Sequence, residues 1–181
     1  MAKALIIVDM VKGFVDESTK KGPCALYIKG ARSIIENINR EIASLSNGDR
    51  VIYVCDNHAP GDAEFKRWPK HCVIGSEESE IASGLTVGQF GVTMKGISYF
   101  LVRKTRFSGF FNTYLDEMLI GVKDVVIVGV ATEYCVFATA LDASYRDLNV
   151  TIPMDCVFAI DQSVGDTSLN WLVASLGVTV R

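Results

Sequence analysis

The chain has 181 residues, enough for one domain with a substantial core, and its 49% hydrophobic and 22% charged content is ordinary for a globular protein. A formal net charge of -3 without a basic stripe gives no electrostatic reason to expect nucleic acid, so small molecules are the expected partners. Five cysteines, an odd number without a CxxC spacing, argue against a disulfide framework and indicate a reducing, cytoplasmic setting.

The predicted secondary structure begins with an apolar run at residues 3–9 that ends in an aspartate. This run is too short for a signal sequence or a membrane span, so we expect the first core strand there and no membrane partner. Short apolar runs predict further strands at residues 50–55, 97–102, 124–128, 149–153 and 178–180. The spacing of apolar residues predicts helices at residues 31–46, 112–120, 136–146 and 167–176.

This alternation of strands and helices is typical of the α/β class, in which right-handed crossovers join parallel strands. We therefore expect a three-layer, doubly wound, mostly parallel six-stranded sheet with helices on both faces. No repeat, low-complexity tract or linker interrupts the sequence, so a single domain over residues 1–181 is expected. The turn after the first strand lacks a GxGxxG pattern, which argues against a dinucleotide site.

Residues 56–96 show little periodicity, and so long an irregular segment in a compact domain is typical of a functional loop. Within it, the glycine-rich stretch 83–96 either covers a pocket or makes a subunit contact, and the sequence does not choose between these roles. Apolar surface outside a domain of this size often serves symmetric assembly, so we expect a homodimer or a larger homo-oligomer.

Cys135 lies where the buried strand at 124–128 passes into a helix. Ligands of open α/β sheets bind at this carboxyl edge. A thiol at a helix N-terminus also meets the positive end of the helix dipole, which lowers the thiol pKa. We therefore interpret Cys135 as a candidate nucleophile, although most free cysteines are small buried hydrophobic residues.

Asp9 and Lys104 follow two other predicted strands, so both are expected at the same sheet edge as Cys135. Asp9 can accept the thiol proton and return it to a leaving amine, and Lys104 can stabilise the negative charge on both partners. Taken singly, Asp9 is typical of a strand end and Lys104 of a surface lysine. Together with Cys135 they predict a catalytic unit.

The loop after the second strand contains the only two histidines, His58 and His71, together with Asp56 and Glu64. Two imidazoles with a carboxylate suit a divalent transition metal such as zinc, manganese or iron. The spacing alone is a weak signal, because Asp and His are common on surfaces. A histidine could instead serve as the base for Cys135, but Asp9 makes that role unnecessary.

Three aromatic residues are expected around the same edge: Phe14, Trp68 and Tyr134. Each of Phe14 and Trp68, taken alone, is more typical of core or loop anchoring. If both face the pocket, they are placed to enclose a flat ring, with Tyr134 beside the nucleophile.

The chain resembles the isochorismatase-like cysteine hydrolases, and among them the nicotinamidase and pyrazinamidase group, over nearly its whole length. The resemblance is carried by Asp9 with Phe14, Asp56-Asn57-His58, Trp68-Pro69-Lys70-His71-Cys72 with the following Val73-Ile74-Gly75-Ser76, Lys104, and Gly129-Val130-Ala131-Thr132-Glu133-Tyr134-Cys135-Val136. Two places depart from the family pattern. Val11 stands where a glutamine is usual, and Val54-Cys55 precede Asp56 where Thr-Arg is usual.

The resemblance implies a catalytic triad of Asp9, Lys104 and Cys135. It also implies a cis peptide bond between Val130 and Ala131, and an oxyanion hole formed by the backbone N–H groups of Ala131 and Cys135. The activity it implies is hydrolysis of nicotinamide to nicotinate and ammonia in NAD salvage, through a thioester on the cysteine.

The resemblance further implies one divalent metal ion, with zinc as the first expectation and manganese or iron as alternatives. Asp56, His58 and His71 would bind it, and Glu64 is placed to complete the set. An open coordination position would take the pyridine nitrogen of nicotinamide.

Other functions stay open at this point. An N-carbamoyl or ureidoacrylate-like amide is the nearest alternative on the same triad; such an anion would require an arginine, for which Arg67, Arg103 and Arg106 are candidates. Isochorismate hydrolysis is disfavoured because the branch of the family with that activity resembles an enzyme without the nucleophilic cysteine, whereas Cys135 is present here. A non-catalytic metal-binding oligomer is also possible, since a fold alone never fixes function.

Overall fold

The computed structural model describes residues 2–91 and 93–181. In this part of the chain, eight strands form one sheet in the order β10-β8-β7-β1-β4-β6-β5, with β9 paired to β7. All pairs are parallel except β5 with β6. The strands are β1 (Lys3–Val8), β4 (Arg50–Asp56), β5 (Thr93–Met94), β6 (Ile97–Lys104), β7 (Asp124–Val130), β8 (Asn149–Ile152), β9 (Val157–Phe158) and β10 (Thr179–Val180).

Helices and a small hairpin complete the described fold. The α-helices are α1 (Lys12–Val15), α2 (Ile35–Ala43), α3 (Leu115–Met118), α4 (Phe137–Ser144) and α5 (Gln162–Leu176). Short 3-10 turns are η1 (Ala31–Ile34), η2 (Ala63–Lys66), η3 (Glu77–Ser79) and η5 (Met154–Cys156), and η4 (Thr132–Val136) is a π-helical turn. The hairpin pairs β2 (Ser18–Thr19) with β3 (Gly22–Pro23).

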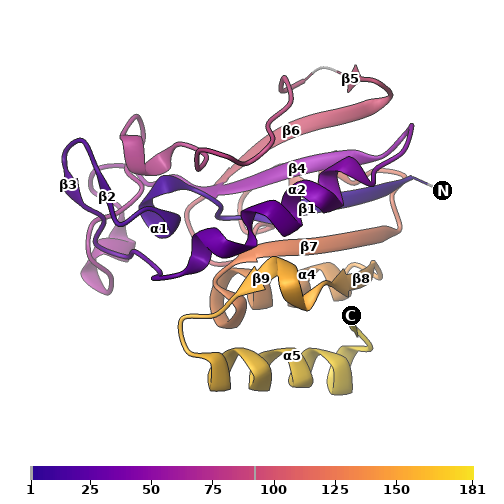
Figure 1. Ribbon diagram of the computed structural model, residues 1–181. Helices are drawn as coiled ribbons and strands as arrows, with labels where there is room; N and C mark the ends of the chain where they lie inside the picture. The colour runs from indigo at the N-terminus through magenta and orange to yellow at the C-terminus, as the bar shows by residue number, and fades with distance from the viewer. Residues whose placement is uncertain (1, 92) are drawn as a thin grey trace.

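The sheet lies between two helical layers, with β1 at its centre (Figure 1). Alternate side chains of β1 enter the two cores: Ile6 packs on one face and Ile7 on the other. Helix α2 covers the Ile7 face, whereas α4 and α5 cover the Ile6 face. The predicted three-layer α/β fold with a mostly parallel sheet is thus confirmed.

The sheet has eight strands in place of the predicted six, because β5 and β9 are only two residues long and carry no usable periodicity. Strand β6 continues to Lys104, two residues beyond the predicted end. Its apolar pattern stops earlier because ion pairs, and not apolar contacts, bury the Lys104 side chain. A search for hydrophobic periodicity does not detect a charged residue at the end of a strand.

The observed helix boundaries also differ from the predicted ones. The predicted helix at 31–46 begins with a 3-10 turn and ends at Ala43, and the one at 112–120 is helical only over α3. Helix α5 begins five residues earlier than predicted, at Gln162, because the Asp161 side chain accepts hydrogen bonds from the N–H groups of Ser163 and Val164. Across the described residues, every helix is too short or too polar to cross a membrane.

Candidate active site

The carboxyl ends of β1, β4, β6 and β7 meet at one edge of the sheet. Asp9 follows β1 with a positive φ of 52°, which turns its side chain toward β4, where its Oδ1 accepts the Asp56 N–H at 2.8 Å. Asp56 is in register with Lys104 on β6. Gly129 lies beside Val8 on the other flank of β1. The sheet register therefore sets the separation of these side chains.

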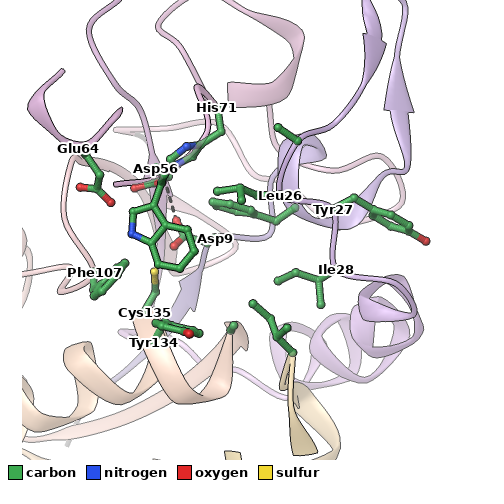
Figure 2. A pocket seen from close by; sticks show the side chains of 15 residues that line it. Asp9, Leu26, Tyr27, Ile28, Asp56, Glu64, His71, Phe107, Tyr134 and Cys135 are labelled. Atoms are coloured by element: carbon green, nitrogen blue, oxygen red, sulfur yellow. Dashed lines mark hydrogen bonds and ion pairs between the residues drawn. The ribbon is translucent and has the colours of Figure 1, made fainter. Parts of the chain in front are cut away.

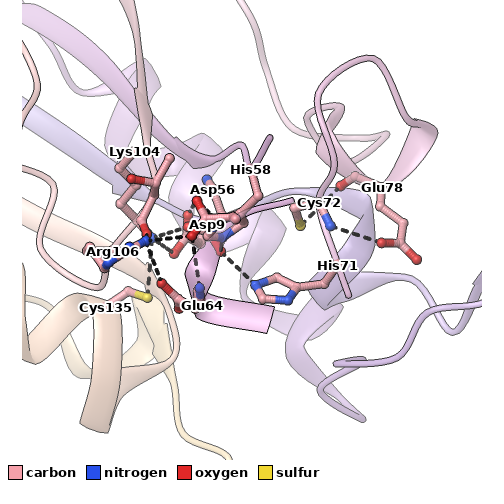
Figure 3. A network of polar contacts seen from close by, with 12 residues as sticks. Asp9, Asp56, His58, Glu64, His71, Cys72, Glu78, Lys104, Arg106 and Cys135 are labelled. Atoms are coloured by element: carbon pink, nitrogen blue, oxygen red, sulfur yellow. Dashed lines mark hydrogen bonds and ion pairs between the residues drawn. The ribbon is translucent and has the colours of Figure 1, made fainter. Parts of the chain in front are cut away.

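Lys104 is the centre of a buried charged cluster (Figure 3). Its Nζ lies 2.7 Å from Asp9 Oδ2, 2.8 Å from Asp56 Oδ1 and 3.4 Å from Cys135 Sγ. One ammonium thus neutralises two carboxylates only in part. Because an unbalanced charge is costly away from water, the cluster favours a further cation or a proton.

The pKa values of the two carboxyl groups are driven apart. Burial raises the pKa of Asp9 to about 6, against the attraction of Lys104 and with the help of the nearby Asp56 charge. Burial also acts on Asp56, but Lys104 and the contacts with His58 and His71 outweigh it and hold the Asp56 pKa well below its usual range. Asp9 is therefore the carboxyl group suited to accept and release a proton near neutral pH.

The thiol pKa of Cys135 differs from the sequence-based expectation. Burial raises this pKa well above its usual value, Lys104 opposes the rise, and the charge and hydrogen bond of Asp9 add to it. Cys135 lies within the π-helical turn η4, ahead of the first α-helical residue at Phe137. The expected lowering by a helix N-terminus is wrong here, because the lost hydration outweighs it. The raised pKa favours the protonated thiol, and Asp9 contributes to this rise through its charge and a hydrogen bond.

Asp56, His58 and His71 form a buried group whose ligand atoms lie within 4.8 Å of one another. Asp56 Oδ2 is 3.0 Å from His58 Nε2 and 3.1 Å from His71 Nε2. The other ring nitrogens contact acceptors: His58 Nδ1 faces Asp62 Oδ2 at 3.1 Å, and His71 Nδ1 faces the Pro69 carbonyl at 2.6 Å.

This pattern fits a divalent metal ion. If each Nδ1 donates its proton, both Nε2 lone pairs point at the same carboxylate oxygen, an arrangement that a shared cation makes favourable. Burial lowers the His58 pKa, but the hydrogen bond and charge of Asp56 outweigh it and leave that pKa raised, which again reflects a place that attracts positive charge. Three protein ligands of this kind are typical of a catalytic metal site with open positions.

Glu64 lies in a second, adjacent group of ligand atoms with His58 and Asp62. Arg106 Nη1 contacts both carboxylates of that group, at 3.0 Å from Asp62 Oδ1 and 3.1 Å from Glu64 Oε2. The backbone N–H of Glu64, the ring of His58 and Arg106 all lower the pKa of Asp62, to about 2. The sequence analysis missed Asp62, although its place four residues after His58 was a readable signal.

A cavity of about 310 Å³ opens above the charged cluster. Figure 2 shows the Asp9 carboxylate and the Cys135 sulfur facing this space, with Leu26 and Ile28 on one side and Phe107 on the other. The described lining residues include no arginine or lysine; they are Asp9, Phe14, Ala25, Leu26, Tyr27, Ile28, Asp56, Glu64, Trp68, His71, Phe107, Ala131, Tyr134, Cys135 and Ile160. The pocket is therefore suited to a small uncharged ligand with an apolar ring.

The three aromatic residues expected at the pocket all line it. Trp68 and Tyr134 meet edge to face with ring centroids 5.8 Å apart, and Phe107 contacts both. Phe14 packs against His71, with centroids 5.7 Å apart. Phe107 and the wall at residues 25–28 were not anticipated, because the wall belongs to an irregular segment without periodicity.

The segment before the cysteine also lies at the pocket. The peptide bond between Val130 and Ala131 is cis, the form that the resemblance implies. Glu133 Oε1 accepts the N–H groups of Ile160 and Asp161, each at 2.9 Å, and so fixes the loop that brings Ile160 to the pocket. Among the described residues of 83–96 none lines the pocket; this stretch packs instead along α2 and β6, through Asn39 and Tyr99.

Comparisons with known proteins agree with this arrangement. A family model described as the isochorismatase domain matches residues 3–181. The chain is 29% identical to a nicotinamidase of Acinetobacter baylyi, over 88% of this chain and 83% of that protein. It is 32% identical to a ureidoacrylate amidohydrolase of Variovorax paradoxus, over 80% of this chain and 64% of that protein.

Among solved structures, the chain is similar to a pyrazinamidase of Pyrococcus horikoshii determined in complex with zinc. The TM-score is 0.81 at 28% sequence identity, and the match covers 100% of this chain and 99% of the other. The likeness therefore extends over the whole sheet and both helical layers.

Proposed function

The chain belongs to the isochorismatase family of hydrolases, and from this premise we propose that it is a nicotinamidase, which converts nicotinamide to nicotinate and ammonia in NAD salvage. The observation that carries the proposal is the buried cluster of Asp9, Lys104 and Cys135 at the floor of an apolar pocket whose described lining holds no cationic side chain. A neutral aromatic carboxamide matches both the cluster and the pocket.

In the proposed mechanism, Asp9 accepts the thiol proton as the sulfur of Cys135 attacks the amide carbon. The N–H groups of Ala131 and Cys135 hold the oxyanion of the tetrahedral intermediate. Asp9 then returns the proton to the leaving nitrogen, and ammonia departs from a thioester. Water cleaves this thioester with Asp9 as the base, which regenerates the thiol and releases the acid. Lys104 stabilises the negative charge that passes between carboxylate and sulfur.

The ring of the substrate would lie among Phe14, Trp68 and Tyr134, which all line the pocket. Asp56, His58 and His71 would hold one divalent metal ion, with zinc as the first expectation and manganese or iron as alternatives. Such an ion supplies Lewis-acid coordination for a ring nitrogen. Glu64 also lines the pocket, and the sequence analysis placed it as a fourth ligand.

An N-carbamoyl or ureido acid is the second candidate substrate, favoured by the likeness to a ureidoacrylate amidohydrolase. Of the three arginines considered for its carboxylate, none lines the pocket, and Arg106 is already paired with Asp62 and Glu64. The pocket therefore argues for the neutral ring.

The test is a comparison of kcat/KM for nicotinamide, pyrazinamide and ureidoacrylate with one protein preparation. We expect the two neutral ring amides to be preferred by at least about 100-fold, because an unpaired carboxylate in this pocket would cost several kcal/mol. A preference for ureidoacrylate would keep the cysteine chemistry and overturn the nicotinamide proposal.

We also propose a cytoplasmic location, which the five free cysteines support.

A further inference from the structure

Two groups of metal-ligating atoms meet at His58. The first contains Asp56 and His71, and the second contains Asp62 and Glu64. Glu64 is not part of the first group, although it lines the same pocket. The charge of the second group faces Arg106, whose Nη1 lies 3.0 Å from Asp62 and 3.1 Å from Glu64. The protein therefore already supplies one cation to this pair of carboxylates.

We propose that Arg106 is a positioning residue that pairs with Glu64 and keeps its carboxylate out of the metal coordination shell, so that Asp56, His58 and His71 are the only protein ligands. The inference rests on the metal site of the proposed function and goes beyond it, because it assigns Glu64 to an ion pair and Arg106 to the control of coordination number. It also explains why Arg106 is not available to bind an anionic substrate.

The contacts hold the Glu64 carboxylate on the side of Arg106, away from the first group. The side chains of Asp62 and Glu64 are only 10% and 9% exposed, whereas that of Arg106 is 40% exposed, so the carboxylates are shielded from water and the guanidinium is partly hydrated. Separating Glu64 from Arg106 would leave a guanidinium facing Asp62 alone and would place a second carboxylate beside Asp56. The ion pair thus opposes a change of Glu64 from salt bridge to ligand.

Arg106 also acts on His58 through Asp62. Asp62 Oδ1 accepts hydrogen bonds from Arg106 Nη1 and, at 2.9 Å, from the Glu64 N–H. Its Oδ2 is therefore left to contact His58 Nδ1. This contact fixes the tautomer in which Nε2 faces Asp56 as an acceptor. The Arg106 guanidinium therefore orients the metal ligand His58 and keeps Glu64 from becoming a ligand.

The absence of Glu64 from the ligand set would affect the net charge of the metal site and the number of open coordination positions. A divalent ion held by Asp56 and two neutral imidazoles keeps one net positive charge, whereas a second carboxylate from Glu64 would neutralise it. An ion with three protein ligands also keeps more positions free for a ring nitrogen and water. Arg106 thereby favours a more electrophilic and more open site.

The test is a double-mutant cycle on zinc affinity, with Arg106→Met, Glu64→Gln and the double variant, measured by competition with a chromophoric chelator. Arg103 is exposed and lies in β6 three residues before Arg106, so Arg103→Met is the matched control. With Arg106 present, Glu64→Gln should change the zinc Kd by less than about threefold. In the Arg106→Met background the same change should weaken zinc binding by about tenfold or more, the range of losing a well-placed ligand partner.

Cobalt substitution gives a second readout that does not depend on turnover. The visible absorption of bound Co²⁺ should weaken in Arg106→Met, since its intensity falls as coordination number rises, and Glu64→Gln should restore it. Thermal unfolding checks that the variants are folded. Arg106→Lys keeps a cation at the position and should leave the response to Glu64→Gln small.

The inference would be overturned by a tenfold loss of zinc affinity on Glu64→Gln with Arg106 in place, or by equal effects of Glu64→Gln in both backgrounds. A protein that binds no zinc or cobalt at all would also overturn it. Ammonia release from nicotinamide, assayed on the same preparations, reports separately on the proposed function, because a protein in which Arg106 does not control Glu64 can still hydrolyse nicotinamide.

Discussion

Asp9 shows how one residue combines structural and chemical roles. Its positive φ turns the side chain across the sheet edge, its Oδ1 accepts the N–H of Asp56, and its Oδ2 pairs with Lys104. Burial raises its pKa to about 6. After burial, which is the largest cause, the same carboxylate also raises the pKa of the Cys135 thiol.

Replacing Asp9 with asparagine should separate thiol ionisation from catalysis. Removing the negative charge favours the thiolate beside Lys104, so the pH at which iodoacetamide alkylates Cys135 should shift downward. Turnover should nevertheless fall by at least about 100-fold, because no group is left to carry the proton to the leaving nitrogen. An alkylation profile that stays in place or moves upward would contradict the assigned role; mass spectrometry of the labelled peptide identifies the cysteine.

At the scale of the elements, the ends of strands position the site, and glycine permits the closest approach. Gly129 in β7 has φ of 115°, and a Cβ built on it would lie 1.9 Å from the Val8 carbonyl oxygen. That oxygen belongs to the central strand β1 and has no freedom to move aside. The close contact between β1 and β7 thus requires glycine two residues before Ala131.

Gly129→Ala should therefore destabilise the protein by at least about 3 kcal/mol, through the clash and the unfavourable φ together. Gly48→Ala is the matched control, because Gly48 also has a positive φ, 94°, but a Cβ there meets nothing within 4 Å. Its cost should be only about 1 to 2 kcal/mol. Urea denaturation measures both; equal losses would show that the contact with Val8 is unimportant.

The strands and most helices could be predicted because buried apolar runs and their periods are local features of the sequence. The positions of Asp9, Asp56 and Cys135 at one sheet edge follow from the parallel topology. Pairing across many residues is not local, and this explains why the contact of Arg106 with Glu64 was not foreseen. The raised thiol pKa was also missed, since the extent of burial depends on the complete packing of the pocket.

At the scale of the whole molecule, the site gathers residues from Asp9 to Cys135 around a central strand, and the outer surface keeps large apolar side chains. Tyr114, Tyr145 and Ile120 are 71%, 67% and 72% exposed. Large exposed apolar side chains of this kind are candidates for burial in an association site.

We predict that the chain forms a homodimer or a larger homo-oligomer. Sedimentation velocity over a concentration series should show a species of at least twice the 19.8 kDa chain mass. A single monomeric species at every concentration would contradict the prediction, without bearing on the chemistry of the pocket.

The central claim is tested most directly by ammonia release from nicotinamide, measured on the purified protein, after chelation, after zinc restoration, and on Cys135→Ala. We predict release that falls on chelation, returns with zinc, and is at least about 1,000-fold lower in Cys135→Ala, whose fold and metal content stay unchanged because the thiol is not a ligand. Undiminished release by Cys135→Ala, or no release from metal-loaded protein with a reactive Cys135, would contradict the account.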